Sequence, residues 1–228
     1  MALVDLFTAD EMELAEHYPS RAERRADLIV HLVGLIGGGI GAGVLFTIAV
    51  MRGGAPLTTA VALYAACLMA MLAFSAVYNL SRRTRARRVL RRLDEAAIFL
   101  MIAGSYTPFA MQLLPAELAT TVTSGVWIAA LAGAAGKVLL PRISDAAWCA
   151  VYLAFAWVGV AFLMPAVQGL PLMVLMLLVM GGIIYSAGVM IYLNQKIPYR
   201  RAIWHAIVVV AAGLHYAAIL TGVVMVAT

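Results

Sequence analysis

The chain has 228 residues, of which 64% are hydrophobic and only 12% charged, and its mean hydropathy is +0.98. A soluble domain carries about 25% charged residues, so this composition excludes the soluble class. The net charge of +5 does not indicate nucleic-acid binding, because the arginines lie mostly in short segments between apolar runs. The composition predicts a polytopic membrane protein with one membrane domain.

The N-terminal residues 1–26 are predicted to form a cytoplasmic segment, and the membrane domain is expected to span residues 27–228. Acidic residues come early in the segment, and no apolar stretch follows a basic start, so a cleavable signal peptide is not expected here. Residues 3–17 are expected to form a short amphipathic helix that lies on the membrane surface.

Seven apolar stretches follow, each long enough to cross a hydrocarbon core of roughly 30 Å. The expected helices span residues 27–50, 57–80, 95–114, 118–138, 146–166, 170–193 and 202–226. Glycine and proline mark most of the breaks, and seven arginines between residues 82 and 92 mark the second one. The predicted fold class is therefore all-α, a seven-helix transmembrane bundle.

The lysines and arginines predict the orientation of this bundle. Three lie in the N-terminal segment, seven in the second connection, two in the fourth and three in the sixth, whereas the other side holds only Arg52. Because positively charged connections stay in the cytoplasm, the N-terminus is expected inside and the C-terminus outside. Six or eight helices would spoil this alternation.

Five polar residues are expected to share one shallow layer at the cytoplasmic border. Ser75 and Asn79 lie four residues apart, hence on one face, at the end of the second helix. Asp94 opens the third helix, while His31 and His205 lie near the cytoplasmic ends of the first and seventh. Polar and ionisable residues inside a span usually face the bundle interior, which makes these five candidates for function.

Each of these residues also has a purely structural interpretation. Asp94 and Glu95 at a helix N-terminus would complement the helix dipole or pair with a neighbouring arginine. The serine and asparagine would hydrogen-bond between packed helices, and the histidines would be satisfied buried side chains. His215 lies ten residues past His205, about 15 Å deeper, so one metal cannot bind both, and a buried hydrogen-bonding role is expected for it.

The chain resembles the haemolysin III proteins of bacteria, which belong with the progestin and adipoQ receptors, over nearly its whole length. The matching segments read YPSRAERRADLIVHLVG, SAVYN, LDEAAIFLMIAGSYTPF and IWHAIVVVAAGLHYAAI. The resemblance implies a multi-pass protein of the bacterial inner membrane with seven helices and a cytoplasmic N-terminus. This agrees with the topology that the charges predict.

The resemblance also implies a zinc ion just below the cytoplasmic surface. Its ligands would be a histidine four residues after the serine of the second helix and two histidines near the start of the seventh. Ser75 and Asp94 would be the catalytic residues of a hydrolase site, suited to the amide bond of a lipid such as ceramide. This chain keeps Ser75, Asp94 and His205.

Two of the three implied imidazoles are absent from this chain. Asn79 and Arg201 occupy those positions, and an arginine places a positive charge where a cation would bind. Zinc normally takes three or four N, S or carboxylate ligands, so the implied ligand set is incomplete. His31 could replace a missing ligand, and the predicted metal ligands are then His31, Asp94 and His205.

The sequence therefore predicts a membrane protein of lipid homeostasis with an altered metal site. Ser75, Asp94, His205 and Arg201 would form a polar lock or a lipid-headgroup pocket, and Arg200 beside them would favour anionic headgroups as partners. One alternative is a zinc-dependent hydrolase of lipid amides. A second is a membrane-permeabilising protein, although a pore needs a polar stripe through the whole span and the polarity here gathers at one side.

Overall fold

The structure is a computed structural model that describes residues 18–81, 86–140 and 143–227, without the side chains of 162–167. Its helices are α2 (Arg21–Arg52), α3 (Gly54–Leu80), α4 (Ala86–Leu113), α5 (Ala116–Leu139), α6 (Asp145–Val167), α7 (Leu172–Leu193) and α8 (Arg200–Ile219), which a π-helical turn η2 (Leu220–Val224) extends. Six of them are long and apolar enough to cross a membrane, and α6 contributes the shorter apolar stretch Asp145–Ala161. The predicted all-α bundle is confirmed, whereas the amphipathic helix predicted at 3–17 lies outside the described residues.

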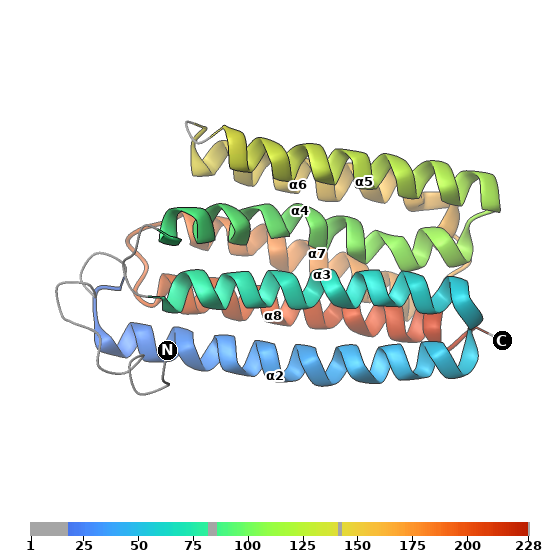
Figure 1. Cartoon of the computed structure of the whole chain (residues 1–228), viewed down its shortest axis with the longest axis horizontal. Helices are drawn as coiled ribbons and strands as arrows, with labels where there is room; N and C mark the ends of the chain where they lie inside the picture. Colours follow the sequence, from blue (N-terminus) through green and yellow to red (C-terminus); the bar gives the residue numbers. More distant parts are fainter. Residues whose placement is uncertain (1–17, 82–85, 141–142, 228) are drawn as a thin grey trace.

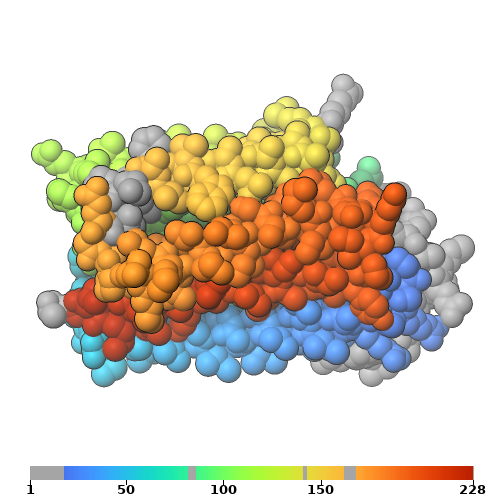
Figure 2. Space-filling view, turned by 180° about the vertical axis from the view of Figure 1, so that it is seen from behind, coloured from blue at the N-terminus to red at the C-terminus, as the bar shows by residue number. Residues whose placement is uncertain are grey.

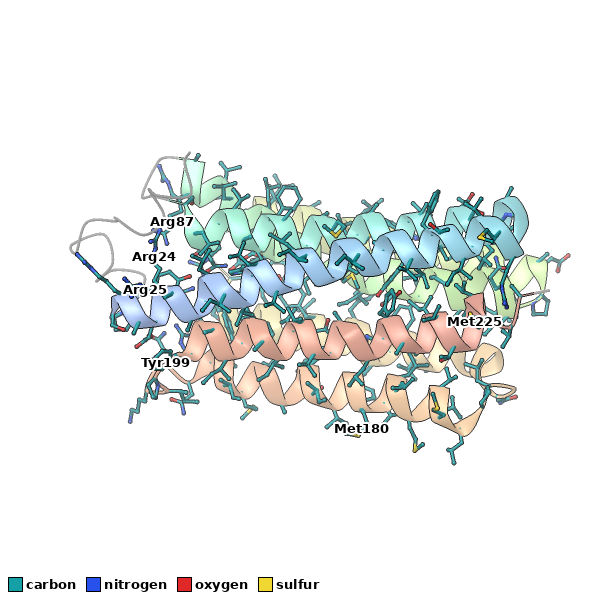
Figure 3. All side chains as sticks on the ribbon, turned by 90° about the horizontal axis from the view of Figure 1, so that it is seen from below. Arg24, Arg25, Arg87, Met180, Tyr199 and Met225 are labelled. Carbon is teal, nitrogen blue, oxygen red and sulfur yellow. The ribbon has the colours of Figure 1, made fainter. Side chains whose placement is uncertain are left out.

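The helices lie side by side with alternating direction (Figure 1). The central helix α4 contacts α3, α5, α6 and α8, while α2 lies at the edge against α3 and α8. Arg24, Arg25, Arg87 and Tyr199 gather at one end of the bundle, and Met225 lies at the other (Figure 3). The concentration of basic residues at one end is the arrangement on which the predicted orientation depends.

Helix α2 begins earlier than the hydropathy predicts, at Arg21 instead of residue 27. The Ser20 hydroxyl accepts a hydrogen bond of 3.2 Å from the backbone N–H of Glu23. A serine followed three residues later by glutamate is a capping box, which satisfies backbone donors at the start of a helix. The last residues of the predicted cytoplasmic segment therefore belong to the first helix.

Helix α4 also begins earlier than predicted, at Ala86. Arginine has a high helix propensity, and Arg91 Nε donates to Glu95 Oε1 four residues on, at 3.0 Å. Asp94 consequently lies in the third turn. The helix-dipole interpretation of Asp94 is wrong, since that effect fades beyond the first turn.

A very short turn joins α2 to α3. Gly54 has a φ of +64°, in the left-handed region that favours glycine, and the N-cap before it is Gly53. A Cβ on Gly53 would come within 2.1 Å of the Leu57 side chain. The two glycines let the chain reverse at once, so that α2 and α3 pack antiparallel along their length.

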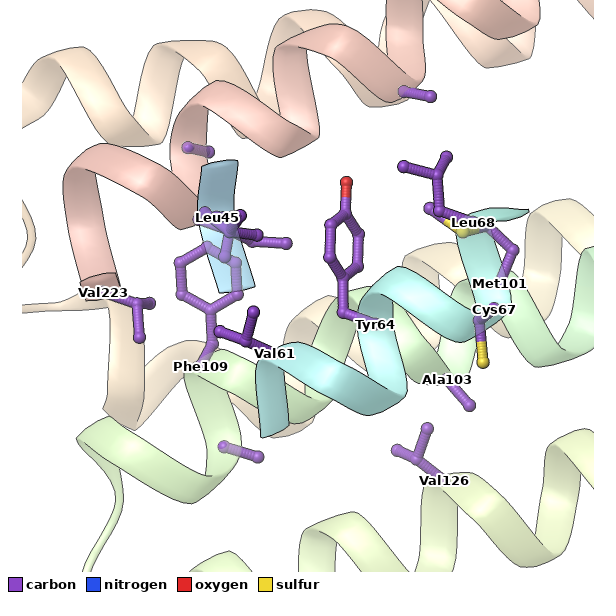
Figure 4. Packing of buried hydrophobic residues seen from close by; sticks show 14 of the residues in the cluster. Leu45, Val61, Tyr64, Cys67, Leu68, Met101, Ala103, Phe109, Val126 and Val223 are labelled. Atoms are coloured by element: carbon purple, nitrogen blue, oxygen red, sulfur yellow. The ribbon is translucent and has the colours of Figure 1, made fainter. Parts of the chain in front are cut away.

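Part of the apolar core lies in the half of the bundle toward this turn. Tyr64, Leu45 and Val61 are fully buried, and Phe109 and Val223 pack with them (Figure 4). These residues come from α2, α3, α4 and η2. The charged side chains that line the internal cavity come from the opposite end of the helices.

Candidate functional site

A cavity of about 1000 Å³ lies inside the bundle. Its polar end is lined by His31, Ser75, Asn79, Asp94, Arg200, Arg201 and His205. Its apolar part continues past Met101 and Leu175 to Val160. The layer of polar residues that the sequence predicts is therefore brought together, at one end of a cavity that extends deep into the apolar interior.

A buried carboxylate, Asp27, lies between two histidines at the polar end. Its Oδ1 is 2.6 Å from His205 Nδ1, and its Oδ2 is 3.4 Å from His31 Nε2. The centroids of the two imidazole rings are 4.4 Å apart. Asp27 is fully buried, and together these three side chains can hold a metal ion.

The local fold explains this group. Asp27 and His31 lie four residues apart on one face of α2, and α8 packs against α2 and supplies His205. Asp27 is not among the predicted site residues, because it lies at the predicted border of the first helix. The signal that points to it is the spacing of Asp27 and His31, which places a carboxylate and an imidazole on one helical face.

Tyr18, three residues before the start of α2, contacts the group of Asp27, His31 and His205. Its hydroxyl donates a hydrogen bond to Asp27 Oδ2, and only 3% of the residue is exposed. Burial and the charge of Asp27 raise the pKa of the Tyr18 phenol, so the hydroxyl stays protonated and remains a donor. The Arg201 guanidinium lies over the Tyr18 ring, 5.9 Å from its centroid.

The two residues in place of the implied zinc ligands are engaged in hydrogen bonds. Asn79 Nδ2 donates to the Ser75 carbonyl oxygen at 3.0 Å and lies 3.5 Å from His205 Nε2. Arg201 donates to Asn79 Oδ1 at 3.4 Å. A guanidinium has no lone pair to offer a metal, so the zinc ligand set that the resemblance implies does not fit this chain.

Asp94 lies apart from the Asp27 group. It lines the cavity beside the Ser75 hydroxyl, within Coulombic range of Arg201 and Asp27. Of the predicted set His31, Asp94 and His205, the structure brings the two histidines together, with Asp27 as the carboxylate between them. Asp94 and Ser75 face the same cavity from α4 and α3.

Two further predicted residues, Arg200 and His215, also line the cavity. Arg200 lies at the polar end, where it donates to the Tyr192 carbonyl oxygen and stacks over the Tyr192 ring. His215 lies deeper, with Nε2 3.3 Å from the Leu178 carbonyl oxygen. As the sequence predicts, His215 hydrogen-bonds away from His205.

An ionic cluster borders the cavity on the side of α4, α5 and α6. Lys137 Nζ lies 2.9 Å from Glu95 Oε2, and Arg91 contacts both Glu95 and Asp145. Lys137 is one of the two basic residues that the sequence places in the fourth connection. The structure buries it within α5, 6% exposed and stacked on Trp148. The cluster ties three helices together beside the cavity.

Comparisons with known proteins place these residues in a family context. A family model described as haemolysin-III related matches residues 23–216. Hemolysin-3 of Bacillus cereus is 28% identical over 198 residues, which cover 87% of this chain and 90% of that protein. A Hemolysin-3 homolog of Bacillus subtilis strain 168 is 32% identical over 141 residues, which cover 62% of this chain and 66% of the homolog. No solved structure matches.

Proposed function

Because the chain belongs to the haemolysin III family and is a multi-pass membrane protein, we propose that it serves lipid homeostasis in the bacterial inner membrane by binding an anionic amphiphile. The observation that carries this proposal is the cavity, which joins a polar layer to an apolar interior. Its volume of about 1000 Å³ is at the upper end of the range for small-molecule pockets. A lipid has the matching division into headgroup and chain.

The two arginines at the start of α8 favour an anionic headgroup at the polar end. Arg200 and Arg201 line this end and lie in the first turn of α8, where the helix dipole adds further positive potential. Ser75 and Asn79 add polar groups for the ester or amide oxygens of a lipid. The chain would extend past Met101 toward Val160, where the lining is apolar.

The cavity also reaches the outer surface between α6 and α7. Trp157 lines the cavity yet is 42% exposed, and its indole N–H donates to Ser186 Oγ at 3.1 Å. A furrow separates α6 from α7 on this face, and atoms of α4 lie at its floor (Figure 2). In a bilayer this face would be in contact with lipid, so we propose that the amphiphile enters here.

Filling the cavity tests the proposal directly. The full-length protein is purified in detergent, and its bound lipids are extracted and identified by mass spectrometry. Ser105 lines the cavity, so Ser105→Trp is expected to remove most of the retained lipid. Ser124 is exposed on α5, and Ser124→Trp is the matched control with unchanged retention. Equal lipid retention in both variants would contradict the proposal.

The preference for an anionic headgroup is tested with vesicles. The protein is equilibrated with phosphatidylglycerol or phosphatidylcholine vesicles, and the retained lipid is measured. Arg201→Gln and Arg200→Gln are expected to lose the preference for phosphatidylglycerol. Arg52 lies at the other end, where it donates to the Met225 carbonyl oxygen, so Arg52→Gln is expected to keep that preference. An undiminished preference in the first two variants would refute the anionic assignment.

Hydrolysis of a lipid amide is a second candidate function. The specific observation in its favour is that Ser75 and Asp94 share the cavity with the Asp27 group. A bound zinc ion would supply Lewis-acid polarisation and an acidic water. Asp94 would accept a proton from the attacking water and pass it to the departing amine nitrogen, and Ser75 would hold the substrate oxygen.

A short-chain ceramide serves as the substrate for this second candidate. Asp94→Asn and Ser75→Ala are expected to abolish release of the fatty acid while the protein still binds the lipid. Turnover that persists in Asp94→Asn would exclude this role. Absence of turnover in the wild-type protein would refute the hydrolase function and leave lipid binding.

A further inference from the structure

We propose that Asp27, His31 and His205 form a binding site for one divalent transition-metal ion, with zinc as the reference ion. The site differs in its ligands from the set that the resemblance implies, because two of its three ligands come from α2. The site would supply the metal ion for the second candidate function, lipid amide hydrolysis. Only the catalytic use of the metal rests on that hydrolase proposal. Metal binding is measured without turnover, so either proposal can fail alone.

The first argument is the charge of Asp27. Its side chain is 0% exposed and accepts one hydrogen bond from Tyr18, and the groups that can pair with its charge among the described residues are His31 and His205. Buried carboxylates are expensive unless a cation or several donors compensate for the lost hydration. A divalent ion between this carboxylate and two neutral imidazoles supplies the compensation and uses the lone pairs of both rings.

The second argument is an unsatisfied atom. His31 is 4% exposed, and its Nε2 has no hydrogen-bond partner among the described residues. Buried polar atoms nearly always have a partner, so an exception indicates an ion or water that completes the site. His31 lines the cavity. A metal ligated by this nitrogen would supply the partner that Nε2 lacks, beside the Asp27 Oδ2 atom 3.4 Å away.

The third argument is the spacing of the donor atoms. Zinc lies about 2.0–2.2 Å from N and O ligands, so two ligands of a tetrahedral site lie roughly 3.4 Å apart. His31 Nε2 and Asp27 Oδ2 are 3.4 Å apart, as such a site requires. Asp27 Oδ1 and His205 Nδ1 are closer, 2.6 Å, as a hydrogen bond requires. This contact would lengthen when a metal ion replaces the shared proton.

The surroundings leave one coordination position open. Three protein ligands plus an open position are typical of catalytic zinc sites, and His31 and His205 both line the cavity. Two imidazoles and one carboxylate form a donor set that suits zinc. Tyr18 donates to Asp27 and is therefore a positioning residue for this ligand.

Metal content is the decisive measurement. The full-length protein is purified in detergent, treated with a chelator, dialysed against zinc chloride and analysed by elemental mass spectrometry. The wild type is expected to hold about one zinc per chain, as a three-ligand site with an open position does. Cobalt substitution provides a second readout, since a tetrahedral site gives intense visible absorption.

Matched variants identify the ligands. Asp27→Asn and His31→Gln are expected to lose the zinc and the cobalt absorption. Asp94→Asn keeps both if Asp27 is the carboxylate ligand, and His215→Gln keeps both because this imidazole lies outside the group. Tyr18→Phe is expected to keep the site with about 10- to 100-fold weaker affinity, as for other groups that orient a ligand.

The proposal fails if the wild type binds less than a tenth of a zinc per chain after dialysis. It fails equally if Asp94→Asn loses the metal while Asp27→Asn keeps it, because the carboxylate ligand would then be Asp94. Gel filtration shows which variants remain folded. Where a variant of α2 does not fold, the wild-type stoichiometry and the response of Asp94→Asn still decide the outcome.

Discussion

Replacement of Gly133 by alanine tests how tightly α5 packs against α4 beside the cavity. A Cβ at this position would lie 2.5–2.7 Å from three carbons of the Phe99 ring. Favourable carbon contacts are about 3.5–4.0 Å, so the two groups must separate by about 1 Å. Phe99 is 1% exposed and its ring packs against Trp148 and Tyr152, with centroids 6.0 and 4.7 Å away. The ring therefore has no room to move, and α5 must shift.

The expected cost follows from this overlap. Overpacking a close-packed interior costs about 1–3 kcal/mol, while alanine is favoured over glycine in a helix by about 1 kcal/mol. Gly125 lies on the same helix, and a Cβ there would meet no atom within 4 Å. Gly125→Ala gains the same helix propensity without the overlap, so the difference between the two variants isolates the packing cost.

Thermal unfolding of the purified protein in detergent measures this difference. Gly133→Ala is expected to unfold below Gly125→Ala by about 2–12 °C, from the usual 2–4 °C per kcal/mol for a chain of this size. Equal midpoints would refute the packing argument, because they would mean that the interface of α4 and α5 yields at no cost.

Three further predictions follow. Lys137→Met is expected to lower the free energy of unfolding by about 1–3 kcal/mol, less than the loss of one partner from an isolated buried pair, because Glu95 still pairs with Arg91. Adding Glu95→Gln to Lys137→Met should restore part of the lost stability in thermal unfolding. No recovery would contradict an ionic cause. Gly181→Ala should displace His215, whose Nε2 lies 2.6 Å from the added Cβ, and should weaken lipid retention without changing the zinc content. Loss of zinc in this variant would contradict the separation of the lipid cavity around His215 from the metal site at Asp27. Liposomes loaded with dye should stay sealed at high protein dose, since the charged lining residues gather at one end of the cavity. Leakage proportional to dose would support permeabilisation instead.

The sequence predicted the bundle well because membrane burial imposes long apolar runs. Each of the seven predicted bundle helices is present among the described residues, and the largest differences are the starts of α2 and α4, six and nine residues earlier than expected. At both starts polar side chains extend the helix beyond the apolar stretch, through the capping box at Ser20 and the pair of Arg91 with Glu95. Hydropathy detects the part of a helix that lies in lipid, so it cannot locate ends that local hydrogen bonds determine.

The site was predicted only in part. The amino-acid sequence by itself determined that His31, Ser75, Asn79, Asp94 and His205 share one layer, because depth along a helix follows from the residue number. It could not determine which carboxylate meets the histidines. That depends on how α2 and α8 rotate against each other, which packing along both helices decides, and only the tertiary structure places Asp27 there and buries Lys137 against Glu95.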